Sequence, residues 1–237
     1  MEINTMITIR NLEKRFPVGK DEFIALRDIN LVFGAGEFAG LIGPSGSGKT
    51  TLLNILGSLD VPSSGEAVVL GYSIGNLSSK QAAKLRKEKL GFIFQSYNLL
   101  AVHTVFENVE FPLLLLNIPK AERNRMVMDA LEWVGLTAKV RSKPPQLSGG
   151  ECQRVAIARA MVKKPSLVLA DEPTANLDAA NSHHILKTME TLNRELKTTF
   201  IFATHDEKVI SYLRRKIFLL DGRVDRDEIV SSKNPQP

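Results

Sequence analysis

Two segments near the N-terminus, residues 6–16 and 23–33, show partial alternation of apolar and polar residues, which predicts two strands joined by a turn. Later segments are short and apolar instead. Two of them, residues 167–170 and 199–203, are nearly continuous apolar runs that suit parallel strands buried on both faces. The other predicted strands cover residues 38–42, 66–70, 90–94 and 217–220, the last of which closes the series.

Helical spacing of apolar residues dominates the middle of the chain, where Pro119, Pro144 and Pro145 separate the helical segments. The pattern predicts an α/β core, about residues 1–95 and 164–230, with a strand-rich N-terminal part and an inserted helical subdomain at about residues 96–163. The predicted helices cover residues 49–58, 104–117, 119–135, 148–163 and 179–195, and residues 231–237 are predicted to form a flexible tail.

The composition excludes a disordered protein, because 43% of the 237 residues are hydrophobic and 24% are charged. The net charge of +5 permits anionic ligands but is too small to predict direct nucleic-acid binding. The single cysteine, Cys152, excludes an intramolecular disulfide. The acidic N-terminus does not predict a signal peptide, and no apolar run approaches the roughly 18 residues of a spanning helix. We therefore expect that the chain does not cross a membrane by itself.

A glycine-rich loop lies between the predicted strand 38–42 and the predicted helix 49–58, in the pattern of a phosphate-binding loop. Glycines let the backbone curl so that several N–H groups point at phosphate oxygens, and the helix N-terminus adds partial positive charge. Lys49 is expected to contact the β- and γ-phosphates, and Thr50 to place its hydroxyl on Mg²⁺. The candidate residues are Gly43, Pro44, Ser45, Gly46, Ser47, Gly48, Lys49, Thr50 and Thr51. The alternative is a chance glycine-rich turn before a helix.

Two carboxylates, Asp171 and Glu172, follow the predicted strand 167–170. In a parallel sheet, ligands bind beyond the carboxyl ends of the strands, so these carboxylates and the glycine-rich loop are expected to meet at one edge. Asp171 would hold Mg²⁺ through water and Glu172 would accept a proton from the attacking water, which predicts nucleotide hydrolysis. The alternative is an acidic pair that caps the following turn.

Two further segments carry candidate chemistry. His205 follows the strand 199–203 at the same predicted edge, where an imidazole can contact the γ-phosphate; a surface turn is the alternative. Residues 147–153, Leu-Ser-Gly-Gly-Glu-Cys-Gln, form a second glycine-rich turn before a helix, with Ser148 as N-cap and Glu151 in the position of a capping box. This turn is either a well-capped helix start or a second anion site.

The motifs together strongly resemble the ATP-binding subunit of ABC transporters, in that family's order and over nearly the whole chain. Residues 43–50 are similar to its Walker A motif, residues 167–171 to Walker B, and residues 147–153 to the signature motif. The resemblance implies a P-loop NTPase (RecA-like) core with an N-terminal antiparallel β subdomain and an inserted α-helical subdomain. Cys152 departs from the Arg or Gln often found at its position, from which we expect a modest effect on turnover.

The same resemblance implies roles for single residues. Glu172 is the implied catalytic base, and His205 is the implied switch histidine. Gln95 is similar to the Q-loop glutamine, which touches Mg²⁺ and senses the membrane subunit, and residues 176–178 are similar to the D-loop. Phe16 stands where an aromatic residue stacks on adenine, with Phe in place of the commoner Tyr.

The family further implies ATP and Mg²⁺ as cofactors and a head-to-tail homodimer. Each ATP would lie between the Walker A motif of one subunit and Ser148, Gly149 and Gly150 of the other. Integral membrane permease subunits are the implied partners, contacted through the Q-loop and the helical subdomain at the cytoplasmic face of the inner membrane. The chain length, residues 176–178 and residues 104–112 are most similar to the branch that releases lipoproteins or exports macrolides.

Three other protein classes share parts of this pattern. DNA-associated ABC ATPases interrupt the core with long coiled coils or zinc modules, but only 105 residues separate Gly43 from Ser148 (148 − 43), without sustained heptads. Ribosome-associated ABC proteins usually carry two cassettes in one chain. In a P-loop kinase, residues 147–153 would have no role. A soluble ABC ATPase that acts on DNA or ribosomes remains the alternative.

Apolar residues between Gln95 and Leu116 have two possible roles. They line a groove for a partner, or they form the core of the helical insert itself. The candidates are Leu99, Leu100, Val102, Val105, Phe106 and Phe111.

Overall fold

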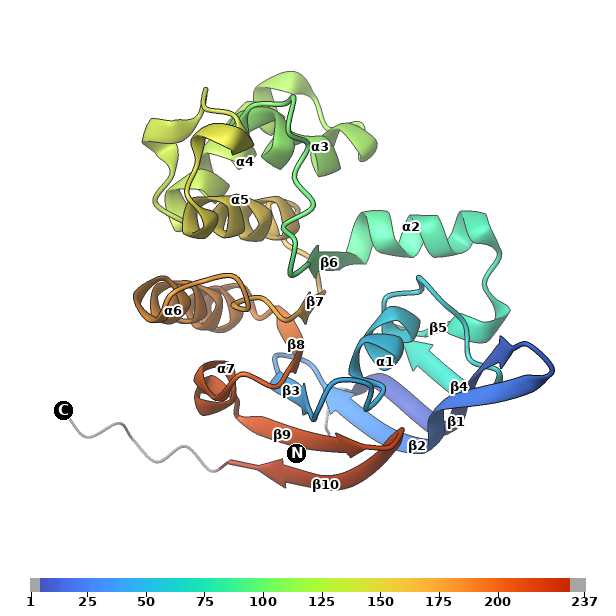
Figure 1. Cartoon of the computed structure of the whole chain (residues 1–237). Coiled ribbons are helices and arrows are strands. Elements are labelled where there is room, and N and C mark those ends of the chain that lie inside the picture. The colour runs from blue at the N-terminus through green and yellow to red at the C-terminus, as the bar shows by residue number, and fades with distance from the viewer. Residues whose placement is uncertain (1–4, 231–237) are drawn as a thin grey trace.

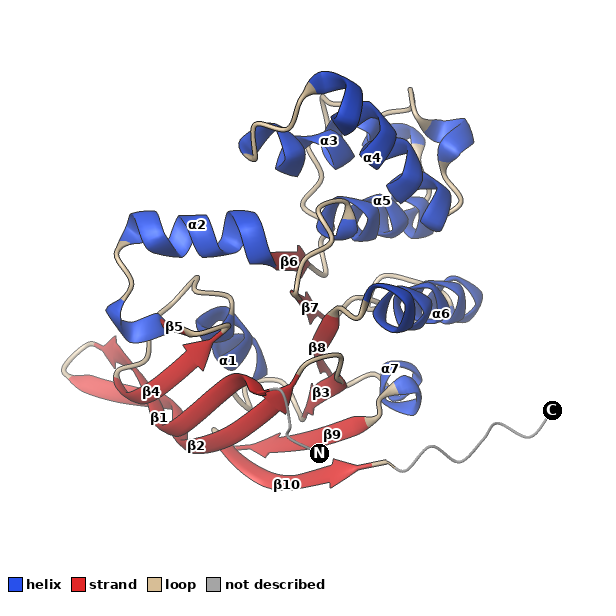
Figure 2. Ribbon diagram, turned by 180° about the vertical axis from the view of Figure 1, so that it is seen from behind, coloured by secondary structure: helices blue, strands red, loops and turns tan. Residues whose placement is uncertain are grey.

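Two β-sheets and a set of helices make up residues 5–230, the part of the chain that the computed structural model describes (Figure 1). The predicted tail, residues 231–237, lies outside the described residues. A mostly parallel sheet lies in the middle, an antiparallel sheet packs on one side, and a helical lobe lies beyond the parallel sheet (Figures 1 and 2). This is the arrangement predicted from the sequence, an α/β core with a strand-rich N-terminal part and an inserted helical part.

The antiparallel sheet has the strand order β2-β1-β4-β5. Its strands are β1 (Thr5–Val18), β2 (Asp21–Gly34), β4 (Ser64–Val69) and β5 (Tyr72–Ser73). β1 and β2 form a long hairpin that turns at Gly19, whose φ of +63° lies in the left-handed region that favours glycine. Because the hairpin pairing runs to its tip, Phe16 stands directly opposite Phe23.

The second sheet has the order β10-β9-β3-β8-β7-β6. Its strands are β3 (Phe38–Ile42), β6 (Leu90–Ile93), β7 (Leu167–Asp171), β8 (Thr199–Thr204), β9 (Arg215–Leu220) and β10 (Arg223–Ile229). All neighbours pair in parallel except β10, which is antiparallel to β9 at the edge. The carboxyl ends of β3, β6, β7 and β8 therefore share one edge.

Helices cover both faces of this sheet. Alternate residues of β8 belong to two different cores: Ile201 packs with α1 (Lys49–Leu56) and the antiparallel sheet, while Phe200 packs with the remaining helices. Those helices are α6 (Ala179–Leu196), α7 (Glu207–Tyr212) and the lobe of α3 (Val105–Leu115), α4 (Lys120–Trp133) and α5 (Gly149–Met161). Within residues 5–230, no helix has the length and apolar character needed to cross a membrane.

The structure contains elements that the apolar pattern does not predict. α2 (Ser79–Lys89) buries only Leu85, so its sequence carries no apolar stripe. α7 has six residues, too short for a clear period. The expectation that strand 217–220 closes the series was wrong, because the charged strand β10 follows it. An edge strand with one solvated face needs little apolar character, and its charges protect the edge.

The apolar residues of the insert divide between the two expected roles. Val105 is fully buried in the lobe, and Leu99 and Phe106 pack against the same core. Leu100, Phe111 and above all Val102, at 76% exposed, face solvent. The first group is core, and only the second group is available to a partner.

Candidate functional site

The site is a cavity of about 360 Å³ at the shared edge of the parallel strands. The glycine-rich loop between β3 and α1 forms its floor, and residues that follow β6, β7 and β8 form its walls. It is lined by Phe23, Ala25, Ser45, Gly46, Gly48, Lys49, Thr50, Thr51, Gln95, Asp171, Glu172 and His205. The structure therefore brings together, from four separate segments, six of the loop residues, both carboxylates, the histidine and the glutamine singled out in the sequence. Gly43, Pro44 and Ser47 belong to the loop but do not line the cavity.

The path of the loop requires glycine at two of its positions. Gly48, which precedes α1, has a φ of +100°, and a Cβ there would lie 2.7 Å from the Ala25 carbonyl oxygen. A Cβ at Gly43 would lie 2.2 Å from the Leu219 carbonyl oxygen. The loop is thus pressed against β2 and β9, and its curl presents the N-terminus of α1 to the cavity.

Lys49 brings a buried positive charge into the loop. Its side chain is buried, and Nζ donates hydrogen bonds to the carbonyl oxygens of Gly43 and Pro44, both at 2.8 Å. Burial lowers the pKa of Lys49, while the nearby carboxylates of Glu172 and Asp171 act in the opposite direction. An ammonium with little water around it interacts strongly with a phosphate.

Thr50 and Asp171 form an oxygen pair at the end of β7. The Thr50 hydroxyl donates to Asp171 Oδ1 at 3.2 Å. Burial raises the pKa of Asp171, and the hydrogen bond from Thr50 opposes that shift. A carboxylate that is costly to ionise in this setting gains most from a cation placed beside it.

Glu172 is held from three directions. Its backbone has a φ of +43°, and its N–H donates to the Ala203 carbonyl oxygen at 2.9 Å. The Thr204 hydroxyl donates to Oε2 at 3.0 Å, and His205 Nδ1 lies 2.6 Å from Oε1. The Glu172 side chain is 14% exposed and that of His205 68%, so the carboxylate sits below an accessible imidazole. A carboxylate fixed in this way at the cavity wall can act as a general base on a water in the cavity.

Gln95 lines the cavity from the segment just after β6. Its backbone carbonyl accepts a hydrogen bond from Asn176 Nδ2 at 2.9 Å, so the segment after β6 is tied to the segment after β7. The side chain of Gln95 is exposed and free to turn toward a ligand.

Phe23 is a site residue that the sequence reasoning missed. It lines the cavity and is 54% exposed, whereas Phe16 is 37% exposed and is not among the lining residues. Paired residues of an antiparallel hairpin point to the same face, so the Phe16 side chain lies on the same face of the hairpin as the Phe23 side chain that lines the cavity. The pairing register was the signal that could have identified Phe23, because a two-residue turn at 19–20 aligns it with Phe16.

The structure does not bring the second glycine-rich turn into this cavity. Ser148 caps α5, and its hydroxyl accepts from the Glu151 N–H at 3.2 Å while Glu151 Oε2 accepts from the Ser148 N–H at 2.8 Å. Ser148 and Gly149 are exposed and Gly150 is buried. Within one chain, residues 148–150 are absent from the described lining of the cavity. The capping-box prediction is therefore confirmed, and the turn points its free N–H groups elsewhere.

These features define the class of the protein. A glycine-rich loop at a helix N-terminus, a buried lysine, a Thr–Asp oxygen pair and a clamped glutamate are the parts of a nucleoside triphosphatase of the P-loop type. Comparison with known proteins identifies the family within that class. The sequence profile of the ABC transporter family matches residues 26–175.

Several known proteins are similar to the chain over nearly their whole length. An uncharacterized ABC transporter ATP-binding protein, YvrO of Bacillus subtilis (strain 168), is 45% identical over 223 residues, which is 94% of this chain and 97% of that protein. A dimeric ATP-binding cassette, MJ0796, in a post-hydrolysis state with ADP and Pi, superimposes with a TM-score of 0.89 at 38% identity, covering 96% of this chain and all of the other. CbiO1 of Clostridium perfringens, part of the ABC transporter complex cbiONQ, gives a TM-score of 0.85 at 30% identity, covering 94% and 88% of the two chains.

The chain belongs to the ABC transporter family. It is an ATP-binding subunit and an ATPase, as the fold, the profile match and the solved relatives agree. The alternative of a soluble ABC ATPase that acts on DNA or ribosomes is not favoured by these relatives, whose names are those of transporter components.

Proposed function

We propose that two copies of the chain clamp two ATP molecules head to tail, each between the loop 43–51 of one copy and Ser148, Gly149 and Gly150 of the other. The observation that carries this proposal is that Ser148 and Gly149 of the second glycine-rich turn are exposed, and that the turn does not line the nucleotide cavity of its own chain. A second copy can supply the missing wall. MJ0796, the relative with ADP and Pi, is dimeric, which supports the same arrangement here.

Within each site we assign Glu172 as the general base and His205 as its neighbour toward the γ-phosphate. Thr50, Asp171 and Gln95 would hold Mg²⁺, which supplies positive charge to the β- and γ-phosphate oxygens when bound. The Thr50–Asp171 oxygen pair fits this role. Mg²⁺ in such sites takes one or two protein oxygens plus phosphates and water, and residues 5–230 contain no larger cluster of metal ligands. Phe16 and Phe23 together would contact adenine.

The dimer is tested by Ser148→Asp. Aspartate is as good an N-cap as serine, so α5 keeps its cap, but the added negative charge repels the γ-phosphate of the ATP held by the other copy. We expect ATP-dependent dimerisation to weaken by about 10-fold or more, with ATP binding to the monomer unchanged. Analytical ultracentrifugation with ATP in a Glu172→Gln background measures the dimer.

Ser78→Asp is the matched control, because Ser78 caps α2 with the same capping-box geometry and does not line the nucleotide cavity. It should leave dimerisation at the wild-type level. Loss of ATP binding to the Ser148→Asp monomer would contradict the trans arrangement, because it would place Ser148 in its own chain's site.

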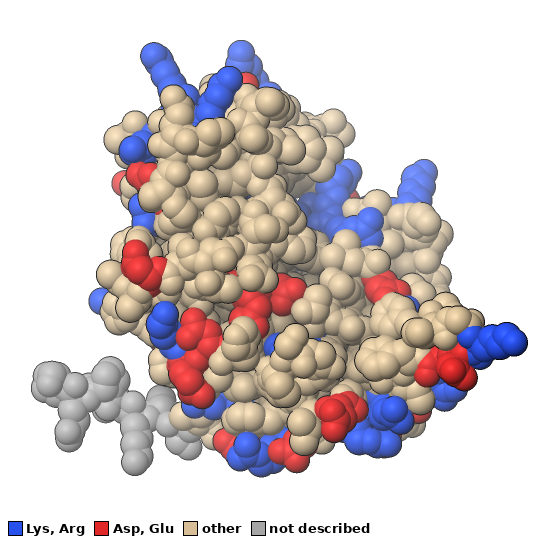
Figure 3. Space-filling model, viewed as in Figure 1, with Lys and Arg blue, Asp and Glu red and all other residues tan. Residues whose placement is uncertain are grey.

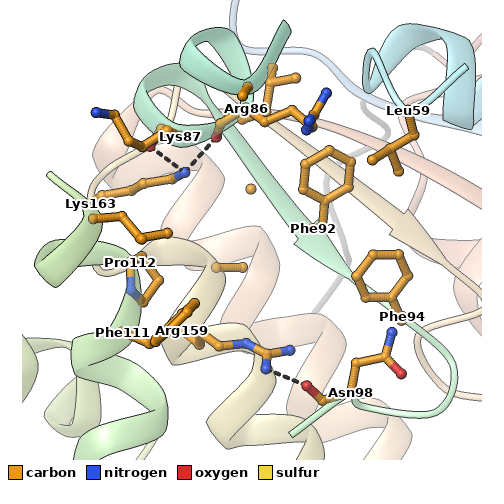
Figure 4. Close-up of a pocket in the computed structure, with 15 residues that line it drawn as sticks. Leu59, Arg86, Lys87, Phe92, Phe94, Asn98, Phe111, Pro112, Arg159 and Lys163 are labelled. Atoms are coloured by element: carbon orange, nitrogen blue, oxygen red, sulfur yellow. Dashed lines mark hydrogen bonds between the residues drawn. The ribbon is translucent and has the colours of Figure 1, made fainter. Parts of the chain in front are cut away.

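We further propose that an integral membrane subunit docks in a groove between α2, the segment after β6, α3 and α5. The groove encloses a cavity of about 430 Å³. Phe92, Phe94 and Phe111 give it an apolar surface, with Leu59 at one rim (Figure 4). Phe111 and Leu59 are exposed, at 44% and 50%. Exposed apolar groups in a concave site are typical of a binding surface.

The groove also carries four cations: Arg86, Lys87, Arg159 and Lys163. Arg159 donates to the carbonyl oxygens of Tyr97 and Asn98, and Lys163 to those of Arg86 and Lys87. Burial lowers the pKa of Lys163 to about 8. None of the four forms an ion pair within residues 5–230. Figure 3 displays positive side chains in the hollow between the helical lobe and α2. The groove therefore favours an amphipathic segment with an apolar face and a carboxylate.

The docking groove is tested by Phe111→Ala, with the membrane protein encoded by the neighbouring open reading frame co-expressed as partner. Loss of an aromatic anchor should weaken the complex by about 10-fold or more, while ATP hydrolysis by the isolated subunit stays at the wild-type rate. Leu114→Ala is the control, because Leu114 is equally exposed on the same helix but does not line the groove. Equal binding by Phe111→Ala and Leu114→Ala would reject the groove as docking site.

These proposals place the chain as a peripheral subunit at the cytoplasmic face of the inner membrane, where ATP is supplied. Residues 104–112 and 176–178 support the branch that releases lipoproteins or exports macrolides. The division into a core and a helical subdomain at about residues 96–163 fits this role, because the docking groove is lined by residues of α2 in the core and of α3 and α5 in the helical subdomain.

A further inference from the structure

Gln153 is a fully buried amide with one unsatisfied end. It lies on α5, its Nε2 donates to the Pro173 carbonyl oxygen at 2.6 Å, and its Oε1 has no hydrogen-bond partner in the described part of the chain. A buried polar atom without a partner costs free energy, so a methionine or leucine of similar volume would suit the packing better. The hydrogen bond to Pro173 is therefore the feature that explains an amide at this buried position.

Pro173 immediately follows the proposed base, Glu172. Because proline lacks an N–H, its carbonyl is its one backbone hydrogen-bonding group, and Gln153 binds that group. On the other side of Glu172, the Glu172 N–H donates to the Ala203 carbonyl oxygen at 2.9 Å. Glu172 is thus fixed between the sheet on one side and α5 on the other, in a backbone conformation with a φ of +43°.

The helix that carries Gln153 begins at the exposed turn of the second glycine-rich motif. Ser148 is the N-cap of α5, and Gln153 lies within the first two turns. Most of α5 is buried, including Val155, Ala156 and Ile157, and a closely packed helix transmits strain along its length. A displacement of the Ser148 end of α5 is therefore passed through Gln153 to Pro173.

Other bonds anchor the same loop to neighbouring segments of the site. The Thr174 hydroxyl donates to Asp206 Oδ2 at 3.0 Å, next to His205, and Asn176 Nδ2 donates to the Gln95 carbonyl oxygen. Gln153 adds a link from the helical lobe. The loop after β7 thus receives contacts from the segment after β6, from the segment after β8 and from α5.

We propose that Gln153 is a positioning residue that couples the two ATP sites of the dimer, so that engagement of residues 148–150 with one ATP sets the Glu172 carboxylate at the other. The inference rests on the proposed head-to-tail dimer. In that dimer, the exposed end of α5 contacts the ATP held by the partner, while Glu172 acts on the ATP held by its own chain. Gln153 donates a direct hydrogen bond from α5 to the loop that holds Glu172.

The test is Gln153→Met, which keeps length and volume and removes the donor to Pro173. We expect kcat to fall by about 10- to 100-fold, as for a misplaced catalytic group, and the Hill coefficient for ATP to fall from about 2 toward 1. ATP affinity of the monomer should stay unchanged, and the melting temperature should change little, because the variant removes the unpaired Oε1 of Gln153 but also takes the donor away from the buried Pro173 carbonyl oxygen. Wild-type kcat and an unchanged Hill coefficient would overturn the proposal.

Two further variants separate positioning from general packing. In a Glu172→Gln background, Gln153→Met should cause no additional loss of kcat, because its effect acts through Glu172; additive losses would overturn the proposal. Asn193→Leu removes another buried amide, which donates to the Thr198 carbonyl oxygen away from the site, and should lower the melting temperature while keeping the Hill coefficient.

Failure of the underlying dimer is recognised separately. It appears as an absence of ATP-dependent dimerisation in the Glu172→Gln chain and as a Hill coefficient of about 1 in the wild type. Failure of the coupling role leaves the wild-type dimer and its cooperativity intact and appears only in the Gln153 variants.

Discussion

The Glu172→Gln variant is expected to hydrolyse ATP at least about 10²-fold more slowly than the wild type, because an amide cannot accept the proton of the attacking water. The substitution is nearly isosteric, and its amide oxygen can keep one of the two contacts, that to Thr204 or that to His205. ATP binding should persist, and an ATP-bound dimer should accumulate. Steady-state hydrolysis at saturating Mg-ATP and size-exclusion chromatography with ATP measure the two effects.

Glu195→Gln provides the control for this experiment. Glu195 is an exposed glutamate near the C-terminal end of α6, outside the nucleotide cavity, and its substitution should leave turnover unchanged. Hydrolysis by Glu172→Gln at the wild-type rate would show that another group activates the water.

The nucleotide site could be predicted from the sequence because its parts stand at the ends of buried strands. The strands β3, β7 and β8 are continuous apolar runs, and a chemical motif follows each of them. Parallel pairing then brings Lys49, Asp171 and His205 to one edge without further information. The local sequence of each segment was sufficient to predict the site, since each motif lies within one short segment.

Elements with little apolar character could not be predicted in this way. α2 buries one residue and β10 is an edge strand of alternating charge, so neither carries a clear period. Their stability comes from tertiary contacts instead. Lys163 donates to the carbonyl oxygens of Arg86 and Lys87 near the end of α2, and Arg215 of β9 forms an ion pair with Asp227 of β10 at 2.7 Å.

The contacts between motifs also could not be predicted from the sequence. The bond between Gln153 and Pro173 joins residues 20 positions apart, and its partner is a backbone carbonyl that no residue type identifies. Phe23 belongs to no motif, and the pairing register of β1 and β2 places it beside the site. A sequence motif identifies chemical groups, whereas the bonds that position those groups follow from how the segments pack.

The second large effect is expected at Lys49. Lys49→Ala should weaken ATP binding by about 10- to 100-fold, the loss of one charge-assisted hydrogen bond to phosphate, worth about 1.5–3 kcal/mol. The cost is high because the ammonium is buried at the cavity wall, where water screens its attraction to a phosphate only weakly. Lys84→Ala removes a lysine from the exposed face of α2 and should leave affinity unchanged. Titration with a fluorescent ATP analogue measures both variants.

Lys49→Ala also reports on the two carboxylates of the site. Both Glu172 and Asp171 interact favourably with the Lys49 ammonium. Without it, the two carboxylates and the incoming triphosphate have no buried counter-charge in the site. ATP binding to the variant should therefore depend more strongly on Mg²⁺ than ATP binding to the wild type does. The deficit in ATP affinity should therefore shrink as the Mg²⁺ concentration is raised, because the metal screens the same negative charge. An ATP affinity equal to that of the wild type at low Mg²⁺ would reject the assignment of Lys49 to the phosphates.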